Sequence, residues 1–382
     1  MPGDEEVPPE RFEVSRRRFL RNAGAVAASV PFAGFLTETL MDMPANASTR
    51  ERVAAGRRAS RNSVFENVFA SHPSYRFTFV NHVTTNPFFT PTRYGAQDAC
   101  SLLGGCSYSW QGSQTSDVGQ MVSAFNAAIA ARVSGIATTV IDKSAFIAPT
   151  NHALSSGIAV VAYNASAPTS TAAQNHQLAY VGQDLFQAGV QAGKKILQKV
   201  KKGDLVAGLI ATPGSLNIQP RIDGASSVLK PAGINFQQVA TGALLSQEAA
   251  AVNAWYLGHK GVKFMYAVDA GSTSQAAAVV LKYKLKGKVF VGGFDFLTTT
   301  VKAIQNGSQL WTIDQQPYLQ GFLPVLQLFF YNISGGLVAP VQTDTGLKFV
   351  TKAQIGPYAK DSRYEGSTTK PVVIKPPATI SV

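Results

Sequence analysis

The chain has 382 residues, of which 45% are hydrophobic and 15% charged, and a formal net charge of +12. This apolar content excludes an intrinsically disordered chain, and the length exceeds what one hydrophobic core usually holds. The basic residues are spread along the sequence without zinc-finger spacing or a basic region with heptads, which argues against a nucleic-acid partner.

The N-terminus has the order of a secretory signal. Residues 15–21 read SRRRFLR, an uncharged run follows at 23–36, and Ala45-Asn46-Ala47 offers small residues for cleavage. This pattern predicts a twin-arginine signal peptide over 1–47, followed by a linker over 48–74. The uncharged run is too short to span a membrane. We therefore expect export to the periplasm or an extracytoplasmic surface, with no membrane insertion after cleavage.

From residue 75 the sequence alternates between strand and helix patterns. Tyr75, Phe77 and Phe79 recur at every second position, which predicts a strand. Met121 and Phe125 lie four residues apart on one face of a predicted helix. The elements expected after the first strand are a helix at 92–103, a strand at 107–111, a helix at 117–132, and strands at 136–141 and 158–163 with a helix between them. This rhythm predicts a parallel sheet covered by helices.

The same rhythm restarts after a Ser-, Thr- and Ala-rich stretch at 165–173. Strands are expected at 178–181, 205–210, 236–241, 264–268, 289–291 and 310–313, and the clearest helices at 183–200 and 317–333. Two such sheets in sequence, each with its own core, leave a cleft between two lobes. The stretch near residue 165 and the turn at 315–317 are candidate hinges.

Polar residues follow two of the apolar strands in the second half. Asp295 comes after Val-Gly-Gly-Phe at 291–294, and Gln315 comes after Trp-Thr-Ile-Asp at 311–314. In an open α/β sheet, ligands bind outside the carboxyl ends of the strands. No nucleophile motif or metal cluster lies near these residues, so the pattern indicates binding. An alternative for Asp295 is the N-cap of a helix over 297–304.

Four motifs occur in a set order: Asn-Pro-Phe-Phe at 86–89, Val-Gly-Gln-Asp at 181–184, Gly-Gly-Phe-Asp at 292–295 and Thr-Ile-Asp-Gln at 312–315. In order and spacing they resemble the periplasmic sugar-binding proteins of ABC importers, of the ribose-binding type (class I). The resemblance covers nearly all of 75–350 and implies an α/β fold of two Rossmann-like lobes with parallel sheets joined by a three-strand hinge. It places 75–166 and 316–345 in the N-terminal lobe, and 167–315 and 346–382 in the C-terminal lobe and tail.

The resemblance also implies a set of ligand-binding residues: Asn86, Phe88, Phe89, Asn164, Gln219, Arg221, Asp269, Asp295 and Gln315. A polyhydroxylated ligand fits these residue types, since aromatic rings cover its C–H face while carboxylates and amides bond its hydroxyls. Alternatives remain open for two groups. One of the two phenylalanines can belong to the core, and Arg221 can pair with Asp223 or Asp269. Trp110 is a rival aromatic surface for the ligand.

The sequence departs from the family after the fourth strand, where Ala165 stands in place of the usual Arg. Loss of a buried charged donor changes which hydroxyl pattern is satisfied, which favours a ligand other than ribose, such as a sugar alcohol. The resemblance implies a small sugar or polyol as ligand, the membrane permease of an ABC importer as partner, and a monomer. Delivery to a sensor instead of an importer is an alternative.

An exported carbohydrate-active enzyme is the remaining alternative, because Asp269 and Asp295 could form the carboxylate pair of a glycosidase. No Gly-x-Ser-x-Gly elbow and no Gly-x-Gly-x-x-Gly fingerprint is present. The histidines lie far apart in sequence, at His72, His82, His152, His176 and His259. We therefore expect no catalysis, no cofactor and no metal.

Cys100 and Cys106 are the two cysteines of the chain. Export to an oxidising compartment allows a disulfide between them. The sequence leaves open whether they are bridged or free. Redox catalysis is not expected, because the spacing is not Cys-x-x-Cys.

Overall fold

The structure is a computed structural model that describes residues 71–167, 176–337, 340–359 and 363–364. The predicted signal peptide, nearly all of the predicted linker and the end of the C-terminal tail lie outside the described residues. No helix in the described ranges is long and apolar enough to cross a membrane.

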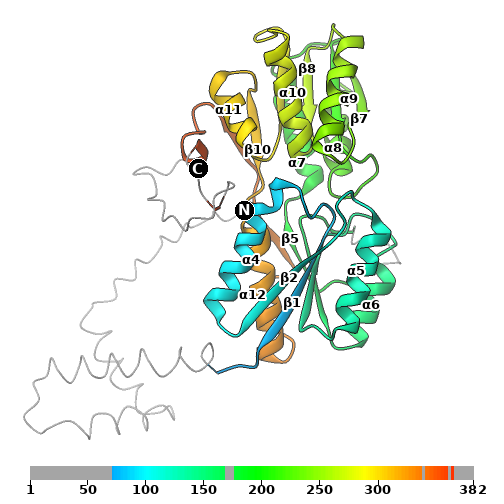
Figure 1. The fold of residues 1–382 in the computed structure, drawn as a ribbon. Helices are drawn as coiled ribbons and strands as arrows, with labels where there is room; N and C mark the ends of the chain where they lie inside the picture. The colour runs from blue at the N-terminus through cyan, green and yellow to red at the C-terminus, as the bar shows by residue number, and fades with distance from the viewer. Residues whose placement is uncertain (1–70, 168–175, 338–339, 360–362, 365–382) are drawn as a thin grey trace, which may run out of the picture. The chain divides into compact units, whose positions relative to one another are not determined.

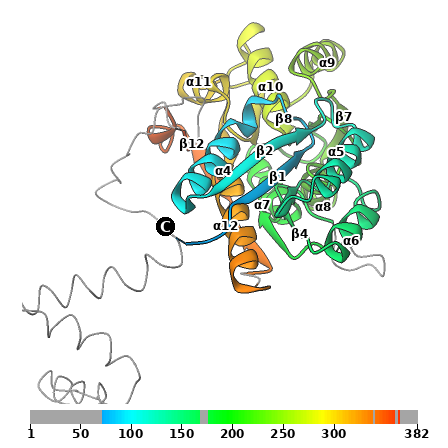
Figure 2. The same ribbon diagram turned by 60° about the horizontal axis from the view of Figure 1, so that its bottom comes forward.

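The first lobe is built on a six-stranded parallel sheet with the order β11-β5-β4-β3-β1-β2. Its strands are β1 (Tyr75–Asn81), β2 (Cys106–Gly112), β3 (Gly135–Thr138), β4 (Ala159–Tyr163), β5 (Ala179–Gly182) and β11 (Gln342–Asp344). Its helices are α4 (Thr90–Leu103), α5 (Val118–Ala130), α6 (Ile147–Ser155) and α12 (Leu319–Ser334). Figures 1 and 2 show α4 and α12 on one side of the strands, with α5 and α6 on the other.

Alternation along the strands explains this layering. Phe77 and Phe79 belong to the core beneath α4 and α12, whereas Val80 and Ile136 belong to the core beneath α5 and α6. A parallel sheet is buried on both faces, so its strands carry apolar residues at nearly every position. All five residues of β4 are buried in this way.

The second lobe repeats the plan with the strand order β12-β10-β9-β8-β6-β7, in which β12 is antiparallel to β10. The strands are β6 (Leu205–Ile210), β7 (Asn235–Ala240), β8 (Phe264–Ala267), β9 (Phe290–Phe294), β10 (Trp311–Asp314) and β12 (Lys348–Thr351). The helices are α7 (Leu185–Leu197), α8 (Gln219–Leu229), α9 (Leu245–Gly258), α10 (Ala270–Lys282) and α11 (Thr298–Asn306). Val206 packs with α7 and α8, and its neighbour Ala207 packs with α9 and α10. The predicted architecture of two α/β lobes with mostly parallel sheets is confirmed.

One part of the predicted division of the chain is wrong. The boundary at residue 166 assigned 167–182 to the second lobe, but β5 pairs with β4 and β11 in the first sheet. The chain therefore first passes to the second lobe at Gln183, between β5 and α7. The Ser-, Thr- and Ala-rich stretch suggested a hinge because it lacks an apolar pattern, whereas the lobe of a strand depends on its pairing partner.

Two further passages between the lobes follow β10 and β11. The chain leaves the second sheet after Asp314 and enters α12, which packs against α4 and β4 of the first lobe. It returns between β11 and β12, over residues 345–347. Neither β11 nor β12 was expected from the sequence. Both are short, and β11 reads Gln-Thr-Asp without apolar alternation.

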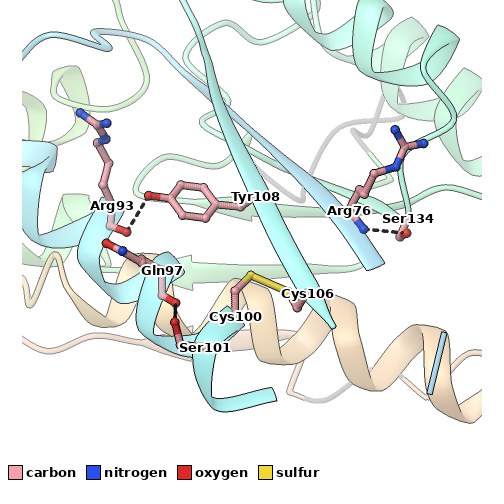
Figure 3. Close-up of a disulfide and its surroundings, with 8 residues drawn as sticks. All are labelled: Arg76, Arg93, Gln97, Cys100, Ser101, Cys106, Tyr108 and Ser134. Carbon is pink, nitrogen blue, oxygen red and sulfur yellow. Dashed lines mark hydrogen bonds between the residues drawn. A yellow bond between two sulfur atoms is a disulfide. The ribbon is translucent and has the colours of Figure 1, made fainter. Parts of the chain in front are cut away.

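A disulfide joins Cys100, near the end of α4, to Cys106 at the start of β2, with 4.8 Å between their Cα atoms (Figure 3). The bond closes the tight turn through Gly104 and Gly105, which both have positive φ angles of 66° and 52°. Glycine adopts such angles without steric cost. The disulfide therefore fixes the connection between the first helix of the sheet and its edge strand.

We expect the double substitution Cys100→Ala/Cys106→Ala to lower the free energy of unfolding by about 2 kcal/mol, since a cross-link over a short loop restricts the unfolded chain. Denaturant unfolding of the oxidised protein and the variant measures this difference. The variant should match the wild type treated with reductant. Two reactive thiols in the exported wild-type protein would contradict the bridge.

Candidate functional site

A small polar cavity lies between the two lobes, at the carboxyl ends of both sets of strands. Its volume is about 50 Å³. The lining residues are His82, Asn86, Phe88, Phe89 and Asn164 from the first lobe, and Asn217, Ile218, Arg221, Asp269, Ala270, Asp295 and Gln315 from the strand ends and helix starts of the second. Eight of the nine sequence-predicted site residues are thus brought together. Gln219 is the exception.

Arg221 is the most buried charged group of the cavity, with 2% of its surface exposed. Its Nη1 donates to the Val268 carbonyl at 2.8 Å, its Nη2 donates to Gln183 Oε1 at 3.3 Å, and its guanidinium lies 4.0 Å from the centre of the Phe294 ring. Its Nε–H is buried and has no acceptor among the described residues. Burial lowers the pKa of Arg221, while Asp295 nearby favours the charged form. The side chain therefore brings a fixed, incompletely satisfied donor to the cavity.

A glycine in α7 determines how closely α7 approaches the backbone of Arg221 in α8. A Cβ atom at Gly189 would lie 2.2 Å from the Arg221 carbonyl oxygen. Such a distance is impossible for a real side chain, so α7 and α8 can only meet here through glycine. The Ala-Gly pair at 188–189 thus lets α7 pack closely against α8, the helix that carries Arg221.

Asp295 and Gln315 form a second polar pair. Gln315 Nε2 donates to Asp295 Oδ1 at 2.6 Å, and both residues are buried. Burial raises the pKa of Asp295 to about 7, and the opposing pull of the Arg221 charge is smaller. Asp295 does not cap α11, whose N-cap is Leu297. The alternative interpretation as a helix cap is therefore excluded, and the second carboxylate oxygen is left for another partner.

Asn164 connects the cavity to the passages between the lobes. Its Nδ2 donates to Gln320 Oε1 at 3.0 Å and to Gln315 Oε1 at 3.4 Å. Gln320 Nε2 in turn contacts Gln315 and the Thr345 hydroxyl, at 3.0–3.2 Å. Asn164 and Asp295 both have positive φ angles, 62° and 71°. Such strain in non-glycine residues costs of order 1–3 kcal/mol and tends to occur at functional sites.

Asp269 lines the cavity but uses both carboxylate oxygens on the backbone. Oδ1 accepts from the Ser272 amide at 2.8 Å, which makes it the N-cap of α10, and Oδ2 accepts from the Ala211 amide at 3.1 Å. The buried carboxyl of Glu248 lies behind it, and burial together with the nearby Asp269 raises the pKa of Glu248 far above its usual range. Asp269 thus holds the start of α10 in place at the edge of the cavity.

The aromatic wall comes from the turn after β1. Asn86 Oδ1 accepts from the Phe88 amide at 3.0 Å and caps the short 3-10 helix η1 (Pro87–Phe89). The rings of Phe88 and Phe89 meet edge to face with centroids 4.7 Å apart. Both rings line the cavity and both belong to the core of the first lobe, with Ala270 of the second lobe in the same cluster. Phe88 and Phe89 are therefore both core residues of the first lobe and lining residues of the cavity.

Gln219 lies away from the cavity. Its side chain accepts from the Gly214 amide and donates to Asp223 and Gln238, at 2.8–3.0 Å. It is two residues before Arg221 on α8, and side chains at that spacing point to different sides of a helix. Trp110 is not among the lining residues, although it packs 6.0 Å from Phe89 in the wall behind them.

Four lining residues were not predicted: His82, Asn217, Ile218 and Ala270. His82 follows β1 directly, so the rule that singled out Asp295 as a polar residue after an apolar strand could have found it. Asn217 and Ile218 precede α8, and no local pattern marks them, because their role depends on contact with the other lobe. Among the described residues no cluster of His, Cys, Asp or Glu could hold a metal ion.

The lobes also contact each other directly beside the cavity. The Leu216 amide donates to the Ile141 carbonyl at 2.9 Å, and the Leu216 side chain packs into the core of the first lobe. Asn217 Nδ2 lies 3.0 Å from His82 Nε2. Leu216 and Asn217, which precede α8, therefore connect the second lobe to the first beside the cavity.

Two parallel-sheet lobes that enclose a polar cavity at their strand ends define a two-lobe binding protein. The profile of the periplasmic binding protein domain matches residues 77–331. The chain is 48% identical over 320 residues to the xylose/arabinose-binding protein XylF of Sulfolobus acidocaldarius, an alignment that covers 81% of this chain and 78% of that protein. The chain belongs to the periplasmic binding protein family, and the predicted resemblance is confirmed.

Solved structures give the same fold. One is an ABC transporter solute-binding protein from Burkholderia graminis in complex with D-arabinose, which is 25% identical with a TM-score of 0.69, covering 76% of this chain and 99% of that one. Another is GanP, a glucose-galactose binding protein from Geobacillus stearothermophilus, 25% identical with a TM-score of 0.67, covering 75% and 100% of the two chains.

Proposed function

We propose that this protein captures a small sugar or polyol between its lobes and delivers it to the permease of an ABC importer. The observation that carries this proposal is the unsatisfied Nε–H of Arg221, buried at a cavity shared with Asp295 and an aromatic pair. A sugar offers a hydroxyl to each polar group and a C–H face to the rings. No catalytic role is needed for any of these residues.

A pentose is the favoured ligand. The 48% identical relative is named for xylose and arabinose, and a structural relative was solved with D-arabinose. The presence of Ala165 where the family usually has Arg does not argue against a pentose. Ala165 is fully buried in the core beneath α5 and α6 and does not line the cavity. The polar side chains that would distinguish one pentose from another are then those of Arg221, Asp295, Asn164 and Gln315.

Binding would proceed by hinge closure. The cavity of about 50 Å³ is far smaller than the roughly 300–1,000 Å³ of small-molecule sites. A sugar therefore enters when the lobes separate, and it favours closure because it bonds both. The passages at Gln183, at 315–316 and at 345–347 are the proposed hinge. We also propose the division of the chain into two lobes at these points. The proposed ligand set is the eight predicted residues that line the cavity, with Gln219 left out.

The proposal also includes export by the twin-arginine route and work as a monomer outside the membrane. A permease would recognise the closed form. Delivery to a sensor would use the same closed form. An importer permease is favoured because the solved structural relative with D-arabinose is described as an ABC transporter component.

Thermal unfolding in the presence of single compounds tests the ligand class. We expect D-xylose or an arabinose to raise the Tm, since a ligand at 100 times its Kd adds about 2.7 kcal/mol to the folded state. D-ribose, D-glucose, xylitol and myo-inositol serve as comparison compounds. A rise with xylitol or myo-inositol alone would move the ligand to polyols. No rise with any of them would overturn the sugar-binding proposal.

A further inference from the structure

A chain of hydrogen-bonded side chains crosses from one lobe to the other at the edge of the cavity. Thr139 Oγ1 lies 3.1 Å from His82 Nδ1 in the first lobe. His82 Nε2 lies 3.0 Å from Asn217 Nδ2 in the second lobe. The Asn217 Oδ1 accepts from the Ser215 hydroxyl at 2.5 Å. Through these contacts a single imidazole joins the two lobes.

The partners determine the protonation of this imidazole. Because Asn217 accepts from Ser215, its amide N–H is the group that faces His82, and Nε2 must be an unprotonated acceptor. Nδ1 then carries the hydrogen and donates to Thr139. The contact is therefore made by neutral His82. An imidazolium would place two donors face to face, unless the amide turned over.

The surroundings oppose a charge on His82 even if the amide turns. Only 5% of the side chain is exposed, and the Phe89 ring lies edge-on at 5.2 Å. The first-lobe groups that share the cavity are neutral, namely Asn86, Phe88, Phe89 and Asn164. The charged groups come from the second lobe, Arg221, Asp269 and Asp295, and none forms a hydrogen bond or salt bridge with the ring among the described residues. Burial accordingly lowers the pKa of His82 to about 3.

We propose that the His82–Asn217 hydrogen bond is an interlobe latch that closes only on a neutral imidazole, so that lobe closure around the sugar releases a proton. This inference rests on the proposed hinge closure. It makes His82 a positioning residue for the bound state, and it couples sugar affinity to the acidity of the surroundings.

The sign of the coupling follows from the two forms. In the open form His82 is in contact with water and has an ordinary pKa near 6.5, about three and a half pH units above its value in the closed form. Above pH 6.5 the ring is neutral in both forms and the latch is fully available. Below that pH the open form binds a proton on His82 that the closed form must lose, so the His82 contribution lowers the affinity about tenfold for each further pH unit.

Asp295 also titrates in the cavity, with the opposite sign. Because burial raises the pKa of Asp295, a proton taken up there as the pH falls favours the closed form. The contribution of His82 is therefore read from the ratio of wild-type to variant affinity at each pH, in which the Asp295 contribution cancels. His82→Gln is the suitable variant, because its amide keeps a neutral polar group and cannot be protonated.

Isothermal titration of the full exported protein with D-xylose or L-arabinose, whichever gives the larger thermal shift, tests the latch between pH 8 and pH 4.5. We expect the wild-type affinity to fall about 100-fold relative to His82→Gln between pH 8 and pH 4.5. In buffers of different ionisation enthalpy at pH 6, binding to the wild type should release about three quarters of a proton more than binding to His82→Gln, because Asp295 takes up the same proton in both proteins. His152→Gln, which removes an exposed histidine on α6, is the matched control and should keep the wild-type profile.

A second variant changes the sign of the interaction. Asn217→Asp places a carboxylate opposite the ring, which accepts a hydrogen bond from imidazolium, so its affinity should fall less in acid than that of the wild type. Parallel pH profiles of affinity in wild type and His82→Gln would overturn the latch while leaving the sugar-binding proposal intact.

A measurement without sugar separates the two proposals. The lobes contact each other in this structure, so the Tm of the wild type should fall relative to His82→Gln as the pH drops below 6.5. Absence of sugar binding at pH 8 would count against the proposed function alone. If no sugar binds, parallel Tm profiles of the wild type and His82→Gln would by themselves reject the latch.

Discussion

Replacing Asp295 by Asn should weaken sugar binding by about 10- to 150-fold and leave the protein more stable at pH 8. The loss reflects a hydrogen bond from a sugar hydroxyl to a buried charged group, worth about 1.5–3 kcal/mol. The gain reflects removal of a carboxylate whose burial costs more than the Gln315 hydrogen bond and the nearby Arg221 charge return. Asparagine keeps the acceptor for Gln315. Isothermal titration and thermal unfolding of the same preparation measure both effects.

The pH dependence of the stability difference follows from the raised pKa. Asp295 binds its proton more tightly in the folded protein than its ordinary value of 3.8 allows, so it costs nothing below pH 3.8 and destabilises increasingly as the pH rises to about 7. Asp295→Asn should therefore raise the Tm most above pH 7 and hardly at all near pH 4.

Asp142 provides the matched control. It follows β3 of the first lobe by four residues, but its carboxylate accepts from the Ser144 and Ala145 amides, and these bonds lower the pKa of Asp142. Asp142→Asn should lower the Tm at neutral pH and leave sugar affinity unchanged. Equal affinities of Asp295→Asn and wild type would remove Asp295 from the site.

Much of the fold could be predicted because parallel strands are buried on both faces. The run Ala159–Tyr163 is apolar throughout and is recognisable without any partner. The strands Gln342–Asp344 and Lys348–Thr351 carry no such signal, since their polar residues become strand only through pairing with β5 and β10. The same reason explains the misplaced boundary before β5. An apolar pattern identifies a strand but not the sheet to which it belongs.

The site was predictable to the extent that it follows strand ends. Asp295 and Gln315 were identified from their position, whereas Arg221 depended on the family motif, because it lies on the buried side of a helix. Gln219 was predicted from the same motif but points elsewhere on that helix. Asn217 could not be found, because its importance arises from His82, 135 residues away in sequence. Contacts that only the tertiary structure creates leave no local pattern.

Replacing Arg221 by Met should have the largest effect on binding, a loss of at least about 100-fold. The substitution removes the Nε–H donor and the positive charge that faces Asp295 across the cavity. Removing one member of a buried charged set typically costs about 3–5 kcal/mol, because the remaining charge is left uncompensated. The pKa of Asp295 should rise above about 7, because the neighbouring positive charge that lowers it is gone. Isothermal titration measures the affinity, and carboxyl NMR of Asp295 measures the pKa.

Arg221→Lys separates charge from geometry. A lysine ammonium keeps the positive charge but lacks the planar arrangement of donors that reaches Val268, Gln183 and the cavity together. The pKa of Asp295 should stay near its wild-type value while sugar affinity still falls. Arg76→Met, at an exposed arginine of β1 whose guanidinium bonds the Ala131 carbonyl, should change neither quantity. Wild-type affinity in Arg221→Met would mean that the buried guanidinium serves the packing of α8 and not the ligand. The sugar would then be held by Asp295, Gln315 and the first lobe.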